Sequence, residues 1–177
     1  RWVDVIKNDP DEYVRATKYV SDVRKLLGVD NLARVMSPVQ PGSVYAYRFD
    51  WDEQATTPDG VNLAIAVGAA HSTEMAFVFG DWNVGFIRGG RLYDPQTNPG
   101  RDRLSTAMMS YWSNFAYAGQ PGKGRQNDLP EWQPWTNGEA KPKMIVLDSE
   151  RDGGIRMSGD EITLGSMKAA FMREKFS

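Results

Sequence analysis

The chain has 177 residues and a mass of 19.9 kDa, with 41% hydrophobic, 25% charged and 11% aromatic residues. These proportions are typical of a globular domain and argue against collagen-like or intrinsically disordered architectures. The formal net charge of −2 argues against nucleic-acid binding through bulk electrostatic attraction. No apolar run approaches the roughly 20 residues that span a bilayer. We therefore expect neither a nucleic-acid partner nor a membrane span.

Two residue counts narrow the chemistry further. The absence of cysteine excludes disulfides, thiolate metal sites and a cysteine nucleophile. The single histidine, His71, excludes a histidine-rich metal centre, and no glycine run matches a dinucleotide or phosphate loop. We therefore expect no metal and no cofactor. The lack of cysteine is compatible with a microbial cytoplasmic, periplasmic or secreted location.

The first third of the chain predicts two helices and then a strand. Residues 11–27 have helical periodicity, Asp9 and Pro10 are typical of a helix start, and Gly28 is typical of a helix end. A short second helix is predicted at 31–36. The apolar stripe of the first helix comprises Tyr13, Ala16, Val20, Val23 and Leu27. Residues 43–51 are predicted as a strand, because Tyr45, Tyr47 and Phe49 alternate along them.

The rest of the chain predicts a long irregular segment that contains His71, followed by a helix, a strand and a helix. The predicted elements are a loop at 52–60, a small apolar stretch at 64–70, a short apolar segment at 77–79, an irregular excursion at 81–103, a helix at 104–117, an aromatic loop at 130–135, a buried strand at 144–147 and a helix at 163–176. Alternating helices and strands indicate an α/β architecture. Two strands are too few for an independent sheet, so we expect polypeptide outside the chain to complete it.

His71 is the main candidate for chemistry, because histidine is the side-chain type whose ordinary pKa lies near neutral pH. The small residues Gly68, Ala69 and Ala70 before it would let a substrate approach closely. The alternative is a surface or core histidine without a catalytic role. Ser72 is a weak candidate nucleophile, because side chains adjacent in sequence rarely face each other. No G-x-S-x-G elbow is present, so a complete Ser-His-acid triad is not visible.

The segment GAAHSTEMAFVFG at 68–80 resembles the histidine block of the type-B carboxylesterases, the family that includes the cholinesterases. The matching residues are His71, Glu74, Phe77, Val78 and Phe79. Ser72 stands where the family commonly has glycine. Five further segments resemble family motifs in collinear order: Ser21-Asp22, VYAYRFDW at 44–51, LSTAMMSYWSNFAYAGQPG at 104–122, LPEWQPW at 129–135 and KMIVLD at 143–148.

The resemblance implies that residues 1–177 are the C-terminal segment of a single α/β-hydrolase domain. The triad order in that fold is serine, acid, histidine. The chain would therefore supply His71 to the Ser-Glu/Asp-His triad of a serine carboxylesterase acting on an ester substrate. The serine and the acid would lie in the N-terminal portion, as a missing upstream part or a second chain. Glu74 would be a buried carboxylate that supports the histidine loop, with a solvated side chain as the alternative. Gly68, Ala69, Ala70 and Ser72 would lie near the pocket.

Two other functions stay open at this point. The chain could be a non-catalytic cholinesterase-like binding or adhesion module, since the family contains such members. It could also be an independent small binding domain that is similar to esterases in pattern only.

Overall fold

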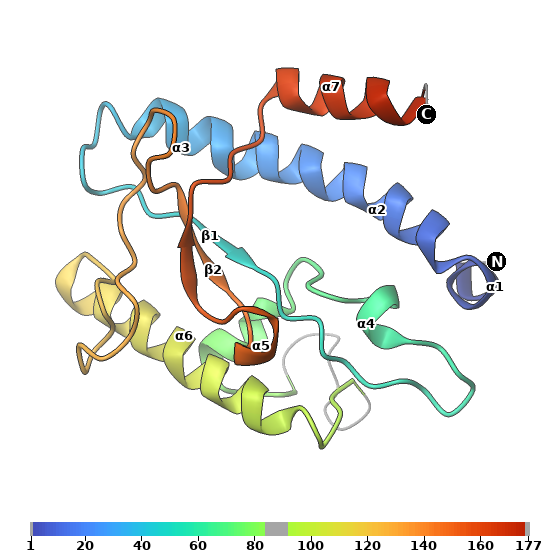
Figure 1. The fold of residues 1–177 in the computed structure, drawn as a ribbon. Coiled ribbons are helices and arrows are strands. Elements are labelled where there is room, and N and C mark those ends of the chain that lie inside the picture. Colours follow the sequence, from blue (N-terminus) through green and yellow to red (C-terminus); the bar gives the residue numbers. More distant parts are fainter. Residues whose placement is uncertain (1, 84–91, 176–177) are drawn as a thin grey trace.

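The computed structural model describes residues 2–83 and 92–175, and a three-stranded sheet lies at its centre (Figure 1). The strands β1 (Tyr47–Phe49), β2 (Met144–Leu147) and β3 (Arg156–Ser158) are arranged in the order β1-β2-β3. β1 is parallel to β2, with Tyr47 opposite Ile145, and β3 is antiparallel to β2. All four residues of β2 are buried, as their continuous apolar sequence predicts. β1 forms one edge of the sheet.

Helices cover both faces of this sheet (Figure 1). The main core joins β1 and β2 to α5 (Glu74–Phe79) and α6 (Asn98–Ala118), and its centre is Phe77, which is fully buried. A smaller cluster joins the other face to α3 (Asn31–Met36) through Ala33, Trp135 and Met144. The long helix α2 (Pro10–Lys25) lies on this second side. The layered arrangement places the sheet between two groups of helices, which is the α/β architecture that the sequence predicts.

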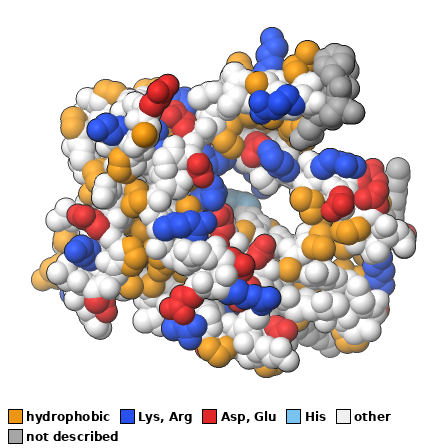
Figure 2. All heavy atoms as spheres, in the orientation of Figure 1, with side chains coloured by type: hydrophobic (Ala, Val, Ile, Leu, Met, Phe, Trp, Pro, Cys, Tyr) orange, Lys and Arg blue, Asp and Glu red, His pale blue; other side chains and the backbone are white. Residues whose placement is uncertain are grey.

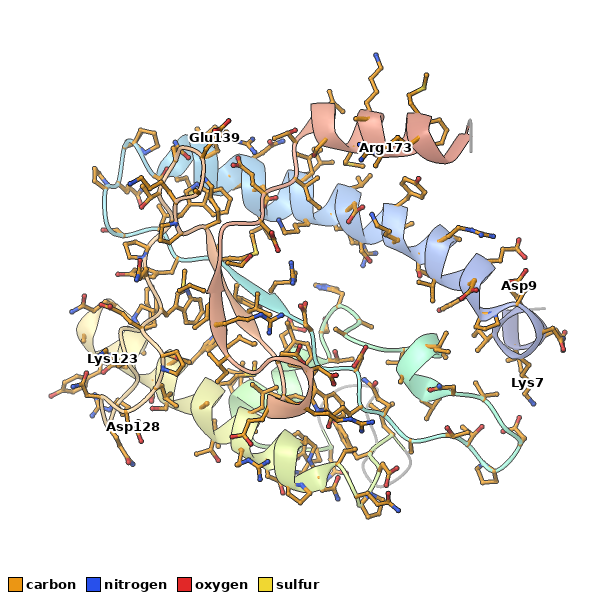
Figure 3. All side chains as sticks on the ribbon, in the orientation of Figure 1. Lys7, Asp9, Lys123, Asp128, Glu139 and Arg173 are labelled. Atoms are coloured by element: carbon orange, nitrogen blue, oxygen red, sulfur yellow. The ribbon has the colours of Figure 1, made fainter. Side chains whose placement is uncertain are left out.

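The start of α2 is the one predicted from the sequence. The Asp9 carboxylate accepts a hydrogen bond of 3.0 Å from the Glu12 N–H, and Pro10 occupies the first turn (Figure 3). The predicted end is wrong. Gly28 does not stop the helix, because a π-helical turn (Leu26–Asp30) continues the chain directly into α3, which is confirmed at the predicted residues. α2 buries none of its residues, and Val20 is 55% exposed. The predicted apolar stripe therefore has no complete cover in the described part of the chain.

Other boundaries follow from tertiary pairing. The predicted strand at 43–51 is reduced to the three residues of β1, because β2, against which it pairs, is itself only four residues long. The predicted loop around His71 contains two short helices, α4 (Leu63–Ala66) and α5. α6 begins at Asn98, six residues before the predicted start, with Pro99 in its first turn, and it ends at Gly119. Residues 84–91 of the predicted excursion lie outside the described residues.

Three further elements carried no clear sequence signal. They are α1 (Trp2–Asn8), a 3₁₀ turn (Glu150–Asp152) and β3. The final helix α7 (Leu164–Lys175) matches its prediction over the described residues. None of the described helices is long and apolar enough to cross a membrane.

A hydrogen bond to the buried Asp30 and an ion pair of Arg34 fasten the segment after β3 to the α2–α3 junction. Asp30 is 0% exposed, and its carboxylate lies 2.5 Å from the Lys25 ammonium and accepts a hydrogen bond of 2.6 Å from the Ile162 N–H. Arg34 on α3 pairs with Glu161 at 2.5 Å. The Asp30–Ile162 and Arg34–Glu161 contacts join residues more than 120 positions apart, so they fix the path of the chain between β3 and α7.

We expect Asp30→Ala to lower the free energy of unfolding by about 3 kcal/mol, because it leaves the Lys25 ammonium and a buried N–H without their partner. Asp22→Ala is the matched control. It removes a partly exposed pair with Lys18 one turn away on α2, and its cost should stay below about 0.5 kcal/mol. Urea unfolding of the two variants measures both values. Equal losses would contradict a special role for Asp30.

Candidate active site

His71 lies in a β-turn between α4 and α5. The turn runs from Ala70 to Thr73, and the Thr73 N–H and hydroxyl both donate to the Ala70 carbonyl, at 3.0 and 2.6 Å. Ser72 has φ +74°, which places it in the left-handed region at the third position of the turn. The turn exposes the imidazole to solvent while the residue after Ser72, Thr73, is buried. Glycine adopts a positive φ without steric cost, which explains why the family that this segment resembles commonly has glycine where this chain has Ser72.

Contacts on both sides hold the turn in place. Upstream, Gly68 has φ +49°, and a Cβ there would lie 2.9 Å from the Ala64 carbonyl oxygen, so glycine is required. The buried Gln54 side chain donates a hydrogen bond of 2.8 Å to the Gly68 carbonyl. Tyr13 of α2 donates to the Ala66 carbonyl at 2.9 Å. Hydrogen bonds from α2 and from the segment that follows β1 therefore hold the residues that lead into the turn.

Downstream, α5 anchors the turn in the main core. Phe77 is fully buried against Phe49 and Trp51, with ring centroids 4.9 and 5.1 Å away. The Ser105 hydroxyl of α6 donates a hydrogen bond of 2.8 Å to the Phe77 carbonyl. Phe77 thus supports the helix that carries Glu74, three residues after His71.

Two cavities meet at His71. One, of about 600 Å³, runs along the free edge of β1 and is also lined by Ser21, Ala70 and Glu74. The other, of about 1480 Å³, lies between α2 and α4 and is also lined by Ser21, Gly68 and Ala69. Figure 2 shows the molecule hollowed beside the pale blue histidine. The structure brings Gly68, Ala69, Ala70 and Glu74 to these two cavities with His71, whereas Ser72 lines neither.

The surroundings of the imidazole are open. Within the described parts of the chain, no side chain donates a hydrogen bond to His71, accepts one from it or forms an ion pair with it. Glu74 is half-buried in the same cavity. Burial raises the pKa of the neighbouring Tyr47, and the Glu74 charge adds to this rise. Ser21 and Asp22 of α2, which resemble a family Ser-Asp pair, line the same cavity as His71.

The comparison with known protein families agrees with the motif at 68–80. The family model described as "Carboxylesterase family" matches residues 4–160. The chain belongs to the carboxylesterase family. The interpretation as an unrelated small domain is therefore wrong.

Individual proteins are also similar in sequence to this carboxylesterase-family chain. Carboxylesterase 5A of Felis catus is 33% identical over 120 residues, which are 67% of this chain and 20% of the cat protein. Acetylcholinesterase of Gallus gallus is 34% identical over 97 residues, which are 54% of this chain and 10% of the chicken protein. The chain thus spans a fifth or less of the length of these relatives.

A solved structure shows the fold. The structure of Aspergillus niger EstA matches 81% of this chain and 24% of its own chain, with a TM-score of 0.53 and 23% identity. Together with the family match and the helix-covered sheet, this match identifies the fold as part of an α/β-hydrolase fold.

A group of acidic residues lies where β1 and β2 end. Asp50 follows β1 and Asp148 follows β2, and the exposed Asp152 lies nearby. Asp148 is buried, with only 7% of its surface exposed. Burial raises the pKa of Asp148 to about 6, and the charges of Asp50 and Asp152 add to the rise. Among the described residues, no three His, Asp or Glu side chains are placed to hold a metal ion.

The strained turn predicts a stabilising substitution. Ser72→Gly should raise the free energy of unfolding by about 0.5–1 kcal/mol, because glycine adopts a positive φ without the steric cost of a Cβ. Ser72→Ala keeps the Cβ and serves as the control, so it should give no such gain. Chemical denaturation of both variants tests this. A glycine variant no more stable than the alanine variant would contradict strain at this turn.

Asp148 predicts a pH effect on stability. Its pKa is raised on folding, so the folded state holds this proton more tightly than the unfolded state between about pH 4 and pH 6. The free energy of unfolding should therefore fall by about 2 kcal/mol from this group as pH rises through that interval. In Asp148→Asn, the free energy of unfolding should not show this fall with pH. At pH 7 it should be higher than that of the wild type.

Unfolding curves at pH 4, 5, 6 and 7 measure the effect. The control is Asp128→Asn, which changes an exposed carboxylate that lies outside the acidic group (Figure 3). This variant should follow the wild-type pH dependence. If Asp148→Asn and the wild type had similar pH profiles, Asp148 would be excluded as the source of the pH-dependent stability.

Proposed function

We propose that this chain is the histidine-bearing part of a serine carboxylesterase, with His71 as the general base. The observation that carries the proposal is the placement of His71. Its imidazole is exposed on a turn that is anchored on both sides, where two large cavities meet. The turn is rigid enough to direct the side chain, and the cavities leave room for a nucleophile and an ester.

The proposed reaction uses His71 twice. In the first step, the imidazole accepts the proton of a serine hydroxyl as the serine oxygen attacks the ester carbonyl, and it then passes this proton to the leaving alcohol. In the second step, it accepts a proton from water, whose oxygen attacks the acyl-enzyme and releases the carboxylic acid. The proton returns to the serine oxygen, so the balance is one ester and one water consumed for one alcohol and one acid.

The serine and the acid that orients the imidazole are proposed to come from polypeptide outside residues 1–177. No described carboxylate or hydroxyl hydrogen-bonds to His71, and the sequence has no G-x-S-x-G elbow. Residues 1–177 would then be the C-terminal segment of one α/β-hydrolase domain, joined to its remainder directly or as a second chain. The limited share of the relatives that this chain spans supports the same arrangement.

The neighbours of His71 have supporting roles in this proposal. Gly68, Ala69 and Ala70 present small side chains or none, which leaves the approach to the imidazole open. Glu74 lines the same cavity, where its carboxylate would favour the imidazolium formed during each step. A non-catalytic binding module of the same family is the alternative, and it would need neither the histidine nor the open approach to it.

His71→Ala tests the proposal in the assembled enzyme that contains this chain. We expect hydrolysis of p-nitrophenyl butyrate to fall by roughly 10⁴-fold or more in kcat. Labelling by a fluorophosphonate, which reports the activated serine, should fall in parallel. Met75→Ala changes an exposed neighbour on α5 and should leave both readouts near the wild-type level.

The isolated 177-residue chain provides the second arm of the experiment. It should neither hydrolyse the ester above the buffer rate nor take up the label. Unchanged turnover of the His71→Ala enzyme, or a label on any serine of this chain, would contradict the proposal. A wild-type assembly without esterase activity would favour the binding module.

A further inference from the structure

We propose that Gln54 is a positioning residue for His71, because its side-chain amide fixes the backbone from which the histidine turn begins. The proposal rests on the proposed function of His71 as the general base. Gln54 would act on the imidazole only through the Gly68 carbonyl. The supporting observations are the burial of the amide, the anchoring of its backbone and the short stretch of chain from Gly68 to His71.

The amide of Gln54 is buried although half of it is unpaired. The residue is 7% exposed, and its Nε2 donates a hydrogen bond of 2.8 Å to the Gly68 carbonyl. Its Oε1 is buried and has no hydrogen-bond partner in the described parts of the chain. Burying an unpaired amide oxygen costs free energy, so an apolar side chain of similar length would suit the interior at least as well. The hydrogen bond to Gly68 therefore explains why an amide is present.

The backbone around Gln54 is tied to two other segments, so the amide acts from a fixed base. Gln54 forms an antiparallel bridge with Tyr93. The N–H of the next residue, Ala55, donates a hydrogen bond of 3.0 Å to the Leu92 carbonyl. The Ala55 carbonyl accepts one of 3.1 Å from the Leu63 N–H at the start of α4. Movement of Gln54 would break these backbone contacts.

Tyr93, which pairs with Gln54, belongs to the main core. Its ring is buried, with the centroid 5.6 Å from that of Trp51, and the Arg101 guanidinium lies 4.7 Å from its centre. Rings in contact stabilise one another, and a guanidinium over an aromatic ring adds electrostatic attraction. The main core thus fixes the position of Gln54, and the amide of Gln54 transmits that position to Gly68.

The Gly68 peptide determines where the histidine turn begins, since only Ala69 and Ala70 separate Gly68 from His71. Gly68 follows α4 with φ +49° and, as glycine, has more backbone freedom than any other residue. A hydrogen bond to its carbonyl restricts this freedom, because it fixes the plane of the peptide that joins Gly68 to Ala69. Rotation of that peptide would displace Ala69, Ala70 and the imidazole together.

General-base catalysis depends on this placement, because the imidazole must lie within hydrogen-bond distance of the serine proton. The His71 side chain makes no hydrogen bond within the described parts of the chain, so the backbone of its turn sets its position. A misplacement of about 1 Å can cost roughly 10²-fold in rate. Loss of the Gln54 amide should therefore slow the reaction without weakening substrate binding.

The test replaces Gln54 by methionine, which has a similar length but cannot donate to the Gly68 carbonyl. In the assembled enzyme that contains the Gln54→Met chain, kcat for p-nitrophenyl butyrate should fall roughly tenfold or more. KM should stay within about twofold of the wild-type value, because no contact with substrate is removed. The urea midpoint should change little, since the variant removes one unpaired buried oxygen, that of Gln54, and leaves the Gly68 oxygen unpaired instead.

Asn114→Leu is the matched control, because it also removes a side-chain amide that donates to backbone carbonyls. The Asn114 amide joins α6 to the loop that follows it, through the Gln120 and Pro121 carbonyls at 3.0 and 3.1 Å. This variant should lower the urea midpoint and leave kcat at the wild-type level. A merely structural role would give Gln54→Met the same pattern as this control.

Backbone NMR order parameters of the 177-residue chain provide a readout that does not depend on catalysis. In the wild type, the amides of Ala69, Ala70 and His71 should have values typical of rigid backbone, about 0.85. In Gln54→Met these values should fall below about 0.6, which is typical of flexible backbone. Asn114→Leu should keep the wild-type values.

The two readouts separate this proposal from the proposed function. Wild-type kcat in Gln54→Met, or unchanged order parameters at Ala70 and His71, would overturn the positioning role. A higher KM with unchanged kcat would assign Gln54 to substrate binding and overturn it as well. An assembled wild type without esterase activity would overturn the proposed function, while the order parameters would still show whether Gln54 holds the turn.

Discussion

The burial of β2 is the constraint on which the other elements depend. Its four residues, Met144 to Leu147, are each 0–1% exposed and pair with β1 on one side and β3 on the other. Buried backbone groups need hydrogen-bond partners, so this central strand requires both neighbours. Its apolar side chains in turn require cover on both faces, which α5 and α6 supply on one face and α3 on the other. The length of β2 also limits how much of the predicted first strand can pair.

The histidine turn depends on the same core through short contacts. Phe77 packs against the β1 side of the sheet, and its carbonyl is tied to α6, so the helix that follows the turn cannot move independently of the sheet. Gln54, which follows β1, fixes the Gly68 carbonyl on the other side. The imidazole of His71 is therefore exposed at a position that the core defines, although it makes no hydrogen bond of its own in the described residues.

The chain combines a well-packed side with an open side. Around Phe77 and Tyr111 the aromatic rings are buried and in edge contact, whereas α2 buries none of its residues. The open side contains both cavities, His71 and the edge of β1 with which no strand of the described residues pairs. An α/β sheet with one bare edge and one uncovered helix face is expected where part of the fold is contributed by other polypeptide. The proposed catalytic role of His71 therefore concerns this open side of the molecule.

Local signals in the sequence determined several elements by themselves. Asp9 and Pro10 fix the start of α2, because capping involves residues only a few positions apart. The apolar run at 144–147 predicted β2, the periodicity at 104–117 predicted most of α6, and the motif at 68–80 indicated the family. The role of His71 stays a prediction.

Only the tertiary structure decided the features that join distant residues. Gly28 does not end the helix, because the chain continues through a π-helical turn whose Asp30 is held by Lys25 and Ile162. The sequence 74–79 is too short for a helical period to be recognised, and it is helical because Phe77 packs against the sheet. Asp148 carries a carboxylate, yet the buried strand that precedes it brings it into the interior. The sequence alone defines caps, periods and motifs, whereas burial and the free edge of β1 depend on which distant segments the fold brings together.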